Sequence, residues 1–275
     1  MKKNITVAAV VYNEEKRIEN LLRSCQWSDD IIIVDKSSTD GTVEIAENFN
    51  ATVIKVPYSD AGDEVKLAVE AAKNEWLMTL TASDMIHPVL VDELLNLINR
   101  DDFDYDTISM PFAAYTLGIC DKHSPWFIAR KKWLFKKDIF SPCDQVHSET
   151  KNLASKKIYK MKTDKVNALY HFTHQDLDSF FERHIRYTKA EVEKYKNMRH
   201  ALWRVMGEIF AAIAWMLFYK RIWMIGKNGI AIFLAFLSYF MMKYLYIWEH
   251  FHGKGSEKYK KIQADLLQKW EEKKK

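Results

Sequence analysis

The chain has 275 residues, of which 48% are hydrophobic and only thirteen are Gly or Pro, so its composition is that of a folded protein and excludes a disordered one. Its net charge of +4 is unevenly divided, because residues 1–150 hold 16 basic and 25 acidic residues, whereas residues 151–275 hold 25 basic and 12 acidic ones. Cys25, Cys120 and Cys143 match neither a zinc motif nor a disulfide framework, and no signal sequence precedes the first apolar stretch. We therefore expect a protein of the reducing cytosol.

Strand and helix patterns alternate over the first 100 residues. Uninterrupted apolar runs predict buried strands at residues 5–11, 31–34, 51–56 and 76–80. Apolar residues at helical spacing predict helices at residues 17–24, 43–48, 63–73 and 89–98. This alternation predicts a mostly parallel α/β sheet that is covered by helices on both faces.

The stretch from residue 31 to residue 42 is the most informative part of this alternation. Asp35 stands at the carboxyl end of a buried strand, and the polar turn after it opens the next helix. Residues 37–41 are explained by that turn and by helix capping alone. A carboxylate at a buried strand end is better explained by a ligand, because ligands of open α/β sheets bind at this rim.

The pattern is less regular beyond residue 100. Residues 104–112 and 168–172 are predicted as strands, and residues 176–197 as a charged, His-rich helix. Residues 126–135 mix aromatic and basic side chains, and they could form either a strand or a loop at an acceptor site.

Two uncharged stretches follow residue 200. They span eleven residues at 209–219 and fifteen at 228–242, both shorter than the ~20 apolar residues that cross a bilayer. Their flanks are rich in Trp, Tyr and basic residues, so we predict two helices that lie in or dip into a membrane interface. The alternative is a buried hairpin that packs on the domain or on a second copy, which would make the chain a homo-oligomer through residues 201–250.

The basic second half also suggests a nucleic-acid partner. Its charges, however, are interleaved with long apolar stretches, and the first half is acidic around the predicted ligand rim. We therefore expect no nucleic-acid partner.

The order of several motifs resembles the family 2 glycosyltransferases of the GT-A fold. The motifs are Val10-Val11-Tyr12-Asn13-Glu14-Glu15, the run from Val34 to Thr42, and Glu75 to Leu80 followed by an acidic loop. Later stretches resemble a narrower group, the bacterial enzymes that add sugars to lipopolysaccharide core and related surface glycans; these are residues 146–149, 169–172, 186–188 and 226–249. The resemblance implies a GT-A, Rossmann-like domain over residues 1–175, followed by a helical, membrane-associating region over residues 176–275.

The resemblance also implies an activity and a location. The expected reaction is the inverting transfer of a sugar from a nucleotide-sugar donor to a lipid-linked or surface-glycan acceptor. The expected place is the cytoplasmic, inner face of a bacterial plasma membrane, and membrane helices there would raise the effective concentration of the acceptor.

Individual residues take roles by similarity to the same family. Val11, Tyr12 and Glu14 would line the nucleotide slot, and Asp35 would hydrogen-bond the base. Lys66 falls where relatives often carry polar or basic residues near the nucleotide, although a solvated helix lysine explains it equally well. Glu149 matches the acidic residue of a Val-His-Glu pattern and would be the catalytic base, although Ser148 interrupts that pattern and a surface glutamate is the alternative.

The metal motif departs from the family. Relatives end the fourth strand with Asp-any-Asp, which binds Mn²⁺ or Mg²⁺, but the two aligned positions here are Thr81 and Ser83. Asp84 could supply the ligand and share in catalysis if the loop shifts, and His171 could supply a second ligand by similarity. The alternative hypothesis is a metal-independent or non-catalytic relative that binds nucleotide or membrane and serves an active transferase as a partner.

Overall fold

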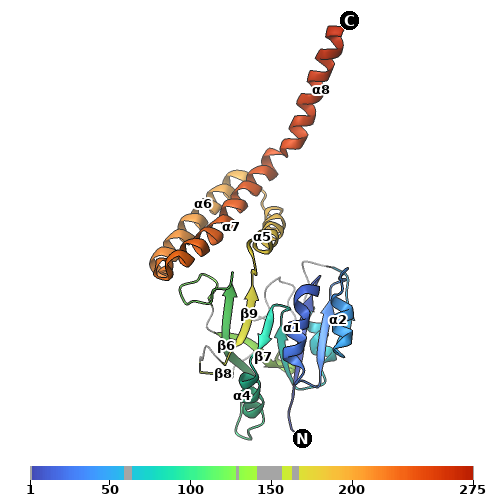
Figure 1. Ribbon diagram of the computed structural model, residues 1–275, viewed down its shortest axis with the longest axis vertical. Helices are drawn as coiled ribbons and strands as arrows, with labels where there is room; N and C mark the ends of the chain where they lie inside the picture. Colours follow the sequence, from blue (N-terminus) through green and yellow to red (C-terminus); the bar gives the residue numbers. More distant parts are fainter. Residues whose placement is uncertain (1, 59–63, 128–129, 141–156, 163–166, 275) are drawn as a thin grey trace. The chain divides into compact units, whose positions relative to one another are not determined.

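The computed structural model describes residues 2–58, 64–127, 130–140, 157–162 and 167–274. The chain divides into two compact units, which are treated separately below (Figure 1). Unit 1 comprises residues 1–116 and 126–173, and unit 2 comprises residues 117–125 and 174–275.

The first half of unit 1 is the predicted alternation of strands and helices. Its strands are β1 (Ile5–Val11), β2 (Ile31–Asp35), β3 (Thr52–Lys55) and β4 (Trp76–Leu80). Its helices are α1 (Glu15–Cys25), α2 (Thr42–Asn48) and α3 (Val65–Ala71). These four strands are mutually parallel in the order β3-β2-β1-β4, which confirms the predicted parallel sheet for this half.

The second half of unit 1 extends the same sheet with a different connectivity. It contains β5 (Asp84–Ile86), α4 (Pro88–Ile98), β6 (Thr107–Thr116), β7 (Arg130–Lys136), β8 (Ile158–Lys160) and β9 (Leu169–Thr173). The order continues from β4 as β7-β6-β9-β5, with β8 paired to β6. Strand β7 runs antiparallel to both of its neighbours, so the segment that the sequence left open as strand or loop forms a strand over residues 130–136.

Helices cover both faces of the parallel strands, and the strand residues alternate between the two cores. One set, including Val7, Ile33 and Met78, packs against apolar residues of α1, α2 and α4. The alternate set, including Ala8 and Ile32, packs against α3 and Phe135. Because both faces are buried, these strands read as continuous apolar runs in the sequence.

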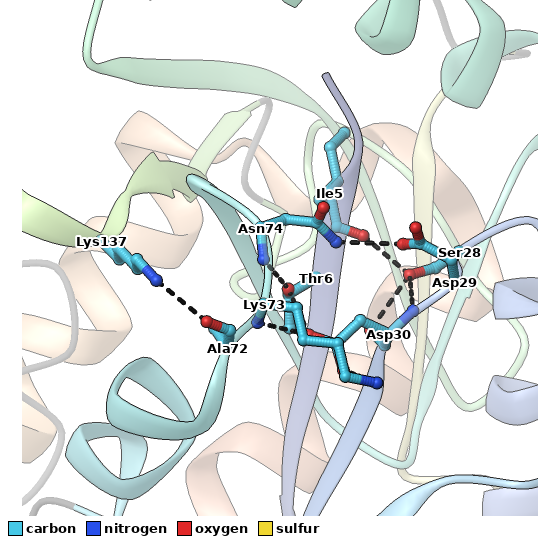
Figure 2. A network of polar contacts seen from close by, with 9 residues as sticks. All are labelled: Ile5, Thr6, Ser28, Asp29, Asp30, Ala72, Lys73, Asn74 and Lys137. Carbon is cyan, nitrogen blue, oxygen red and sulfur yellow. Dashed lines mark hydrogen bonds and ion pairs between the residues drawn. The ribbon is translucent and has the colours of Figure 1, made fainter. Parts of the chain in front are cut away.

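A buried carboxylate holds the amino ends of the parallel strands together (Figure 2). Asp30, which precedes β2 and is 3% exposed, accepts hydrogen bonds from the Thr6 hydroxyl at 2.7 Å and the Lys73 amide at 2.8 Å. The Thr6 hydroxyl in turn accepts the Asn74 amide at 3.2 Å. These hydrogen bonds avoid the free-energy cost of burying a carboxylate without partners. They therefore fix the residues at which β1, β2 and β4 begin. The opposite, carboxyl ends of these strands are left for the candidate site.

Unit 2 consists of a loop at residues 117–125 and of helices over most of residues 177–274. It contains α5 (Leu177–Val192), α6 (Met198–Ala214), which continues as a π turn at Trp215–Tyr219, a 3₁₀ turn at Ile222–Ile225, α7 (Gly226–His252) and α8 (Gly255–Lys274). Helices α6 and α7 lie side by side, and Figure 1 shows them as a hairpin. The hairpin turn is tight at Gly229, where a Cβ atom would lie 2.0 Å from the Ile222 carbonyl oxygen.

The hairpin helices are longer than the uncharged stretches that the sequence shows. Met198–Tyr219 and Ile222–His252 have windows of mean hydropathy 1.5 and 1.8, so by length and composition each could cross a membrane. Only 22% of each window is buried, and the exposed side chains include Trp203, Phe218, Tyr219 and Trp223 at 63–79% exposure. Helix α8 is exposed along its described length.

Candidate functional site

The loops after β1 and β2 are joined by their own hydrogen bonds at the carboxyl edge of the sheet. The last residues of these strands, Val11 and Asp35, are paired in register, so both loops start at the same level. The Asn13 amide donates to the Ser38 hydroxyl at 2.8 Å, and the Thr39 amide donates to the Asn13 side-chain oxygen at 2.8 Å. Asn13 has a φ of 52°, a left-handed conformation that asparagine tolerates better than most residues. The two loops therefore form one structure.

Asp35 lies at the centre of this structure and is 1% exposed. Its carboxylate accepts the Ser38 amide at 3.0 Å, so it closes the turn that follows β2. A carboxylate offers about four lone-pair sites, and this amide occupies only part of that capacity. Asp35 can therefore fix the loop and still accept a hydrogen bond from a ligand.

The same loops hold the start of α1. The Glu14 amide donates to the Thr42 hydroxyl at 2.7 Å, and the Glu15 amide donates to the Asp40 carboxylate at 3.2 Å. Burial raises the pKa of Asp40, but the hydrogen bonds from the Thr42 side chain and from the Glu15 and Thr42 amides outweigh it and leave the pKa below its usual value. Gly41 lets the Glu15 side chain lie close to the loop after β2, since a Cβ atom at residue 41 would lie 3.2 Å from the Glu15 carboxyl carbon.

Aromatic side chains stand beside the loops. The ring of half-buried Tyr12 lies 4.4 Å from the ring of Tyr58, which follows β3. The Lys36 ammonium lies 5.7 Å above the Tyr58 ring and pairs with Glu64 at 3.0 Å. Flat aromatic faces beside a buried carboxylate suit a planar heterocycle. A cavity of about 30 Å³ lies close by, between β1, β4 and α3, with Val10, Val65 and Thr81 among its lining residues.

A guanidinium group connects the loop after β1 with the loop after β4. Arg17, in the first turn of α1, donates from Nε to Glu14 at 2.7 Å, and a second nitrogen pairs with the same carboxylate. Its third nitrogen donates to the Ser83 hydroxyl at 2.7 Å. The side chain of Arg17 is 19% exposed, so this cation is held at the carboxyl edge but stays accessible.

Asp84 and His171 lie together, one on β5 and the other on the antiparallel partner β9. The Asp84 carboxylate is fully buried and contacts His171 Nδ1 at 2.7 Å through one oxygen. Its other oxygen accepts the Thr81 amide at 2.6 Å and the Thr81 hydroxyl at 2.9 Å. The two proposed metal ligands therefore bind each other and the preceding loop.

The donor set around Thr81 and Ser83 does not fit the metal that the family implies. Mn²⁺ and Mg²⁺ prefer several oxygen ligands, with carboxylates among them. Thr81 and Ser83 offer neutral hydroxyls, and both oxygens of Asp84 already accept hydrogen bonds within the protein. Among the residues that the structure describes, no three His, Cys, Asp or Glu side chains are grouped so as to hold a metal ion.

The remaining predicted residues stand apart from this cluster. Lys66 lies on the exposed side of α3 and pairs with Glu70 at 3.7 Å, as a solvated helix lysine would. Glu149 lies outside the described residues, so its role as the base stays a prediction. Cys25 is buried, and this burial raises the pKa of its thiol to about 12, so it carries no nucleophilic thiolate at neutral pH.

Sequence reasoning missed three residues of the site, namely Arg17, Lys36 and Tyr58. Arg17 forms an i, i+3 pair with Glu14, a spacing that is visible in the sequence, and Lys36 directly follows Asp35. The contact between Arg17 and Ser83, however, joins positions 66 residues apart. Only the pairing of β1 with β4 brings them together.

Known proteins show where this chain belongs. An uncharacterized glycosyltransferase of Rickettsia bellii (strain RML369-C) is 33% identical over 95 residues, which make up 34% of this chain and 32% of that protein. The chain thus matches about a third of the length of this relative. Protein RfbJ of Shigella flexneri is 26% identical over 104 residues, 37% of this chain and 81% of RfbJ.

Among solved structures, S. aureus TarS 1–349 in complex with UDP-GlcNAc is similar over 91% of this chain and 92% of that chain, with 15% identity and a TM-score of 0.49. A family model described as Glycosyl transferase family 2 matches residues 6–160, which is more than half of the chain. The chain therefore belongs to glycosyl transferase family 2, which confirms the family and the α/β fold class predicted from its motifs.

Proposed function

We propose that the protein is an inverting glycosyltransferase that moves a sugar from a nucleoside diphosphate sugar to a hydroxyl group of a lipid-linked or surface-glycan acceptor. The observation that carries the proposal is the meeting of the loops after β1, β2 and β4 at one edge of the sheet, within the stretch that matches the family model. In open α/β sheets this edge is where ligands bind.

The residues at this edge suit the parts of such a donor. Tyr12 would stack on the base, Val11 would line the slot from the end of β1, and Asp35 would accept a hydrogen bond from a base N–H group. Buried acceptors that bind one N–H group give strong selectivity, because a base without that group leaves part of the carboxylate's acceptor capacity unused in a site closed to water.

The transfer itself exchanges two bonds at the anomeric carbon. The acceptor oxygen bonds to this carbon while the bond to the phosphate oxygen breaks, and its electron pair leaves with the nucleoside diphosphate. A base must take the acceptor proton as the oxygen attacks. Glu149 remains our proposal for that base. In relatives whose Asp-any-Asp motif is intact, a bound Mn²⁺ or Mg²⁺ would supply positive charge for the diphosphate.

We infer that the acceptor is held at the cytoplasmic face of a bacterial membrane. Helices α6 and α7 expose large apolar and aromatic side chains along most of their length, which supports binding in a membrane interface. A protein anchored there would meet a lipid-linked acceptor at high effective concentration.

A second candidate is a non-catalytic relative that binds nucleotide and assists an active transferase. The hydroxyls of Thr81 and Ser83 in place of two carboxylates favour it. It differs from the first candidate only in turnover, so binding and sugar transfer have to be measured separately.

Calorimetric titration of the full chain with UDP, GDP and CDP tests the shared part of both candidates. We expect one of the three to bind, and Asp35→Asn to weaken that binding about 10- to 100-fold, the worth of a hydrogen bond to a charged group. Asp29→Asn, at the opposite edge of the sheet (Figure 2), is the matched control and should bind as the wild type does.

Two results would overturn the proposal. Absence of binding to all three nucleotides in a folded sample would remove the transferase function altogether. Binding without release or transfer of sugar from the matching nucleotide sugars, in the presence of membrane extracts as acceptor, would leave the non-catalytic candidate.

A further inference from the structure

The guanidinium of Arg17 lies against the residue that stands at the second metal-binding position of the family motif. It donates to the Ser83 hydroxyl at 2.7 Å, while its other two nitrogens are held by Glu14. A guanidinium group that is ion-paired with Glu14 therefore lies at the carboxyl end of β4, where relatives carry carboxylates for a divalent cation.

A divalent cation at the same place would meet two obstacles. It would be repelled by the guanidinium, and the hydroxyl of Ser83 that would have to ligate it already accepts a hydrogen bond from Arg17. Asp84 is turned to Thr81 and His171 and is fully buried, so recruiting it would break contacts of 2.6–2.9 Å.

We propose that Arg17 binds the diphosphate of the donor and that this protein therefore binds its nucleotide without a divalent metal. The inference rests on the proposed function, since it assigns a residue to the diphosphate of that donor. Guanidinium groups suit this role because they stay charged at every physiological pH and present paired N–H donors to phosphate oxygens.

The contacts of Arg17 leave donors for this task. The guanidinium has five N–H bonds, and its contacts with Glu14 and Ser83 engage three of them. Glu14 acts here as a positioning residue, because its two contacts fix the plane of the guanidinium. Ser83 is the neutral partner that a metal-free site allows, since a second carboxylate beside the Arg17–Glu14 ion pair would give the group a net negative charge and repel the diphosphate.

The same charge would assist the chemical step. As the bond between the anomeric carbon and the phosphate oxygen breaks, negative charge grows on the leaving diphosphate. A pre-oriented cation stabilises that charge more strongly than it stabilises the ground state.

The test is calorimetric titration of the full chain with the nucleotide that binds, comparing the nucleoside diphosphate with its nucleoside, in EDTA and in Mn²⁺. For the wild type we expect the affinity for the diphosphate to change less than twofold between EDTA and Mn²⁺. Arg17→Gln should weaken diphosphate binding about 10- to 100-fold and leave nucleoside binding unchanged. Arg17→Lys keeps the charge but not the paired donors, so its affinity for the diphosphate should lie between those of the wild type and Arg17→Gln.

Lys16→Gln is the matched control, because Lys16 is an exposed cation on the same turn of α1. It should bind both ligands as the wild type does. A loss of nucleoside binding in Arg17→Gln would point to damage of the slot, and circular dichroism with thermal unfolding identifies a variant that has not folded.

The outcomes separate this inference from the proposed function. Diphosphate binding that strengthens tenfold or more with Mn²⁺ overturns the role of Arg17 and leaves the transferase intact. If wild type and Arg17→Gln bind the diphosphate with equal affinity, the role of Arg17 is also overturned and the transferase function is again unaffected. Absence of binding to any nucleotide overturns both.

Discussion

Asp84 is the residue at which the sequence and the structure assign different roles to one carboxylate. The sequence offers it as a metal ligand, whereas the structure buries it completely between Thr81 and His171. We predict that Asp84→Ala lowers the free energy of unfolding by about 2–4 kcal/mol, because it removes the buried acceptor of the half-buried donors of Thr81 and His171. Urea unfolding followed by tryptophan fluorescence measures this loss.

Asp101→Asn is the control for this measurement, since Asp101 is exposed in the turn after α4 and its substitution should change the free energy of unfolding by less than about 0.5 kcal/mol, as at other surface positions. If Asp84→Ala unfolds like the wild type but loses a Mn²⁺-dependent affinity for nucleotide, Asp84 is a ligand and not a structural residue.

Local pattern explains which site residues the sequence could and could not reveal. Asp35 could be found because it follows four apolar residues of one strand, and burial of that strand fixes its place at the rim. Arg17 could not, because its contact with Ser83 depends on the pairing of two distant strands, and a helical arginine beside a glutamate is common on any surface. Pairings of this kind are set by the tertiary fold.

Element by element, the sequence predicted β1 to β4, β6 and β9 to within a few residues, left β7 open as strand or loop, and did not predict the three-residue strands β5 and β8. Strands β1, β2 and β4 are buried on both faces, so each is a short apolar run between turns, whereas β3 at the end of the sheet is only half-buried. Strand β7 begins with three charged residues, so it lacks the apolar run or alternation from which a strand is predicted. The ammonium of Lys131 lies 4.0 Å over the Trp133 ring and 4.6 Å over the Phe112 ring, so a charged side chain is accommodated on an aromatic surface that the sequence does not show.

The helices of unit 2 carry an ion-pair cluster, and its loss should destabilise the three helices α5, α6 and α7. Lys243 of α7 is 7% exposed and contacts Glu191 of α5 and Glu208 of α6, each at 3.0 Å. We predict that Lys243→Ala destabilises this unit by about 2–4 kcal/mol, because Glu191 and Glu208 then lose the cation between them and, among the described residues, only Glu208 keeps a basic partner, Arg204 at 3.2 Å. Hydrogen exchange of residues 177–252 should show faster exchange in all three helices.

Lys227→Ala tests the same helix without the cluster, since Lys227 is exposed near the start of α7. Its exchange should match that of the wild type. Faster exchange confined to α7 in Lys243→Ala would show that the ion pairs do not couple the helices.

Considered as a whole, the molecule separates its charges along the chain. The acidic first half contains most of the α/β unit, and the basic second half contains its strands β8 and β9 and the exposed apolar helices α6 and α7. The sequence could predict this division, because charge and hydropathy are properties of composition. The full helix lengths could not be read from the uncharged stretches, because α6 and α7 extend past them through residues such as Glu208 and Lys243, whose charges pair with each other.

The exposed apolar helices α6 and α7 lead us to predict that the protein binds membrane lipid. We expect the full chain to sediment with vesicles that contain phosphatidylglycerol and to bind vesicles of phosphatidylcholine more weakly, because basic residues add attraction to anionic lipid. Phe218→Glu with Trp223→Glu, at the exposed hairpin turn, should reduce binding at least tenfold, a rough bound for placing two charges in the interface. The matched control is Tyr259→Glu with Trp270→Glu, which changes two aromatic residues of α8 that are also largely exposed. If neither pair affects sedimentation and the wild type is a stable dimer that Phe218→Glu dissociates, these side chains are covered by a second copy of the chain and not by lipid.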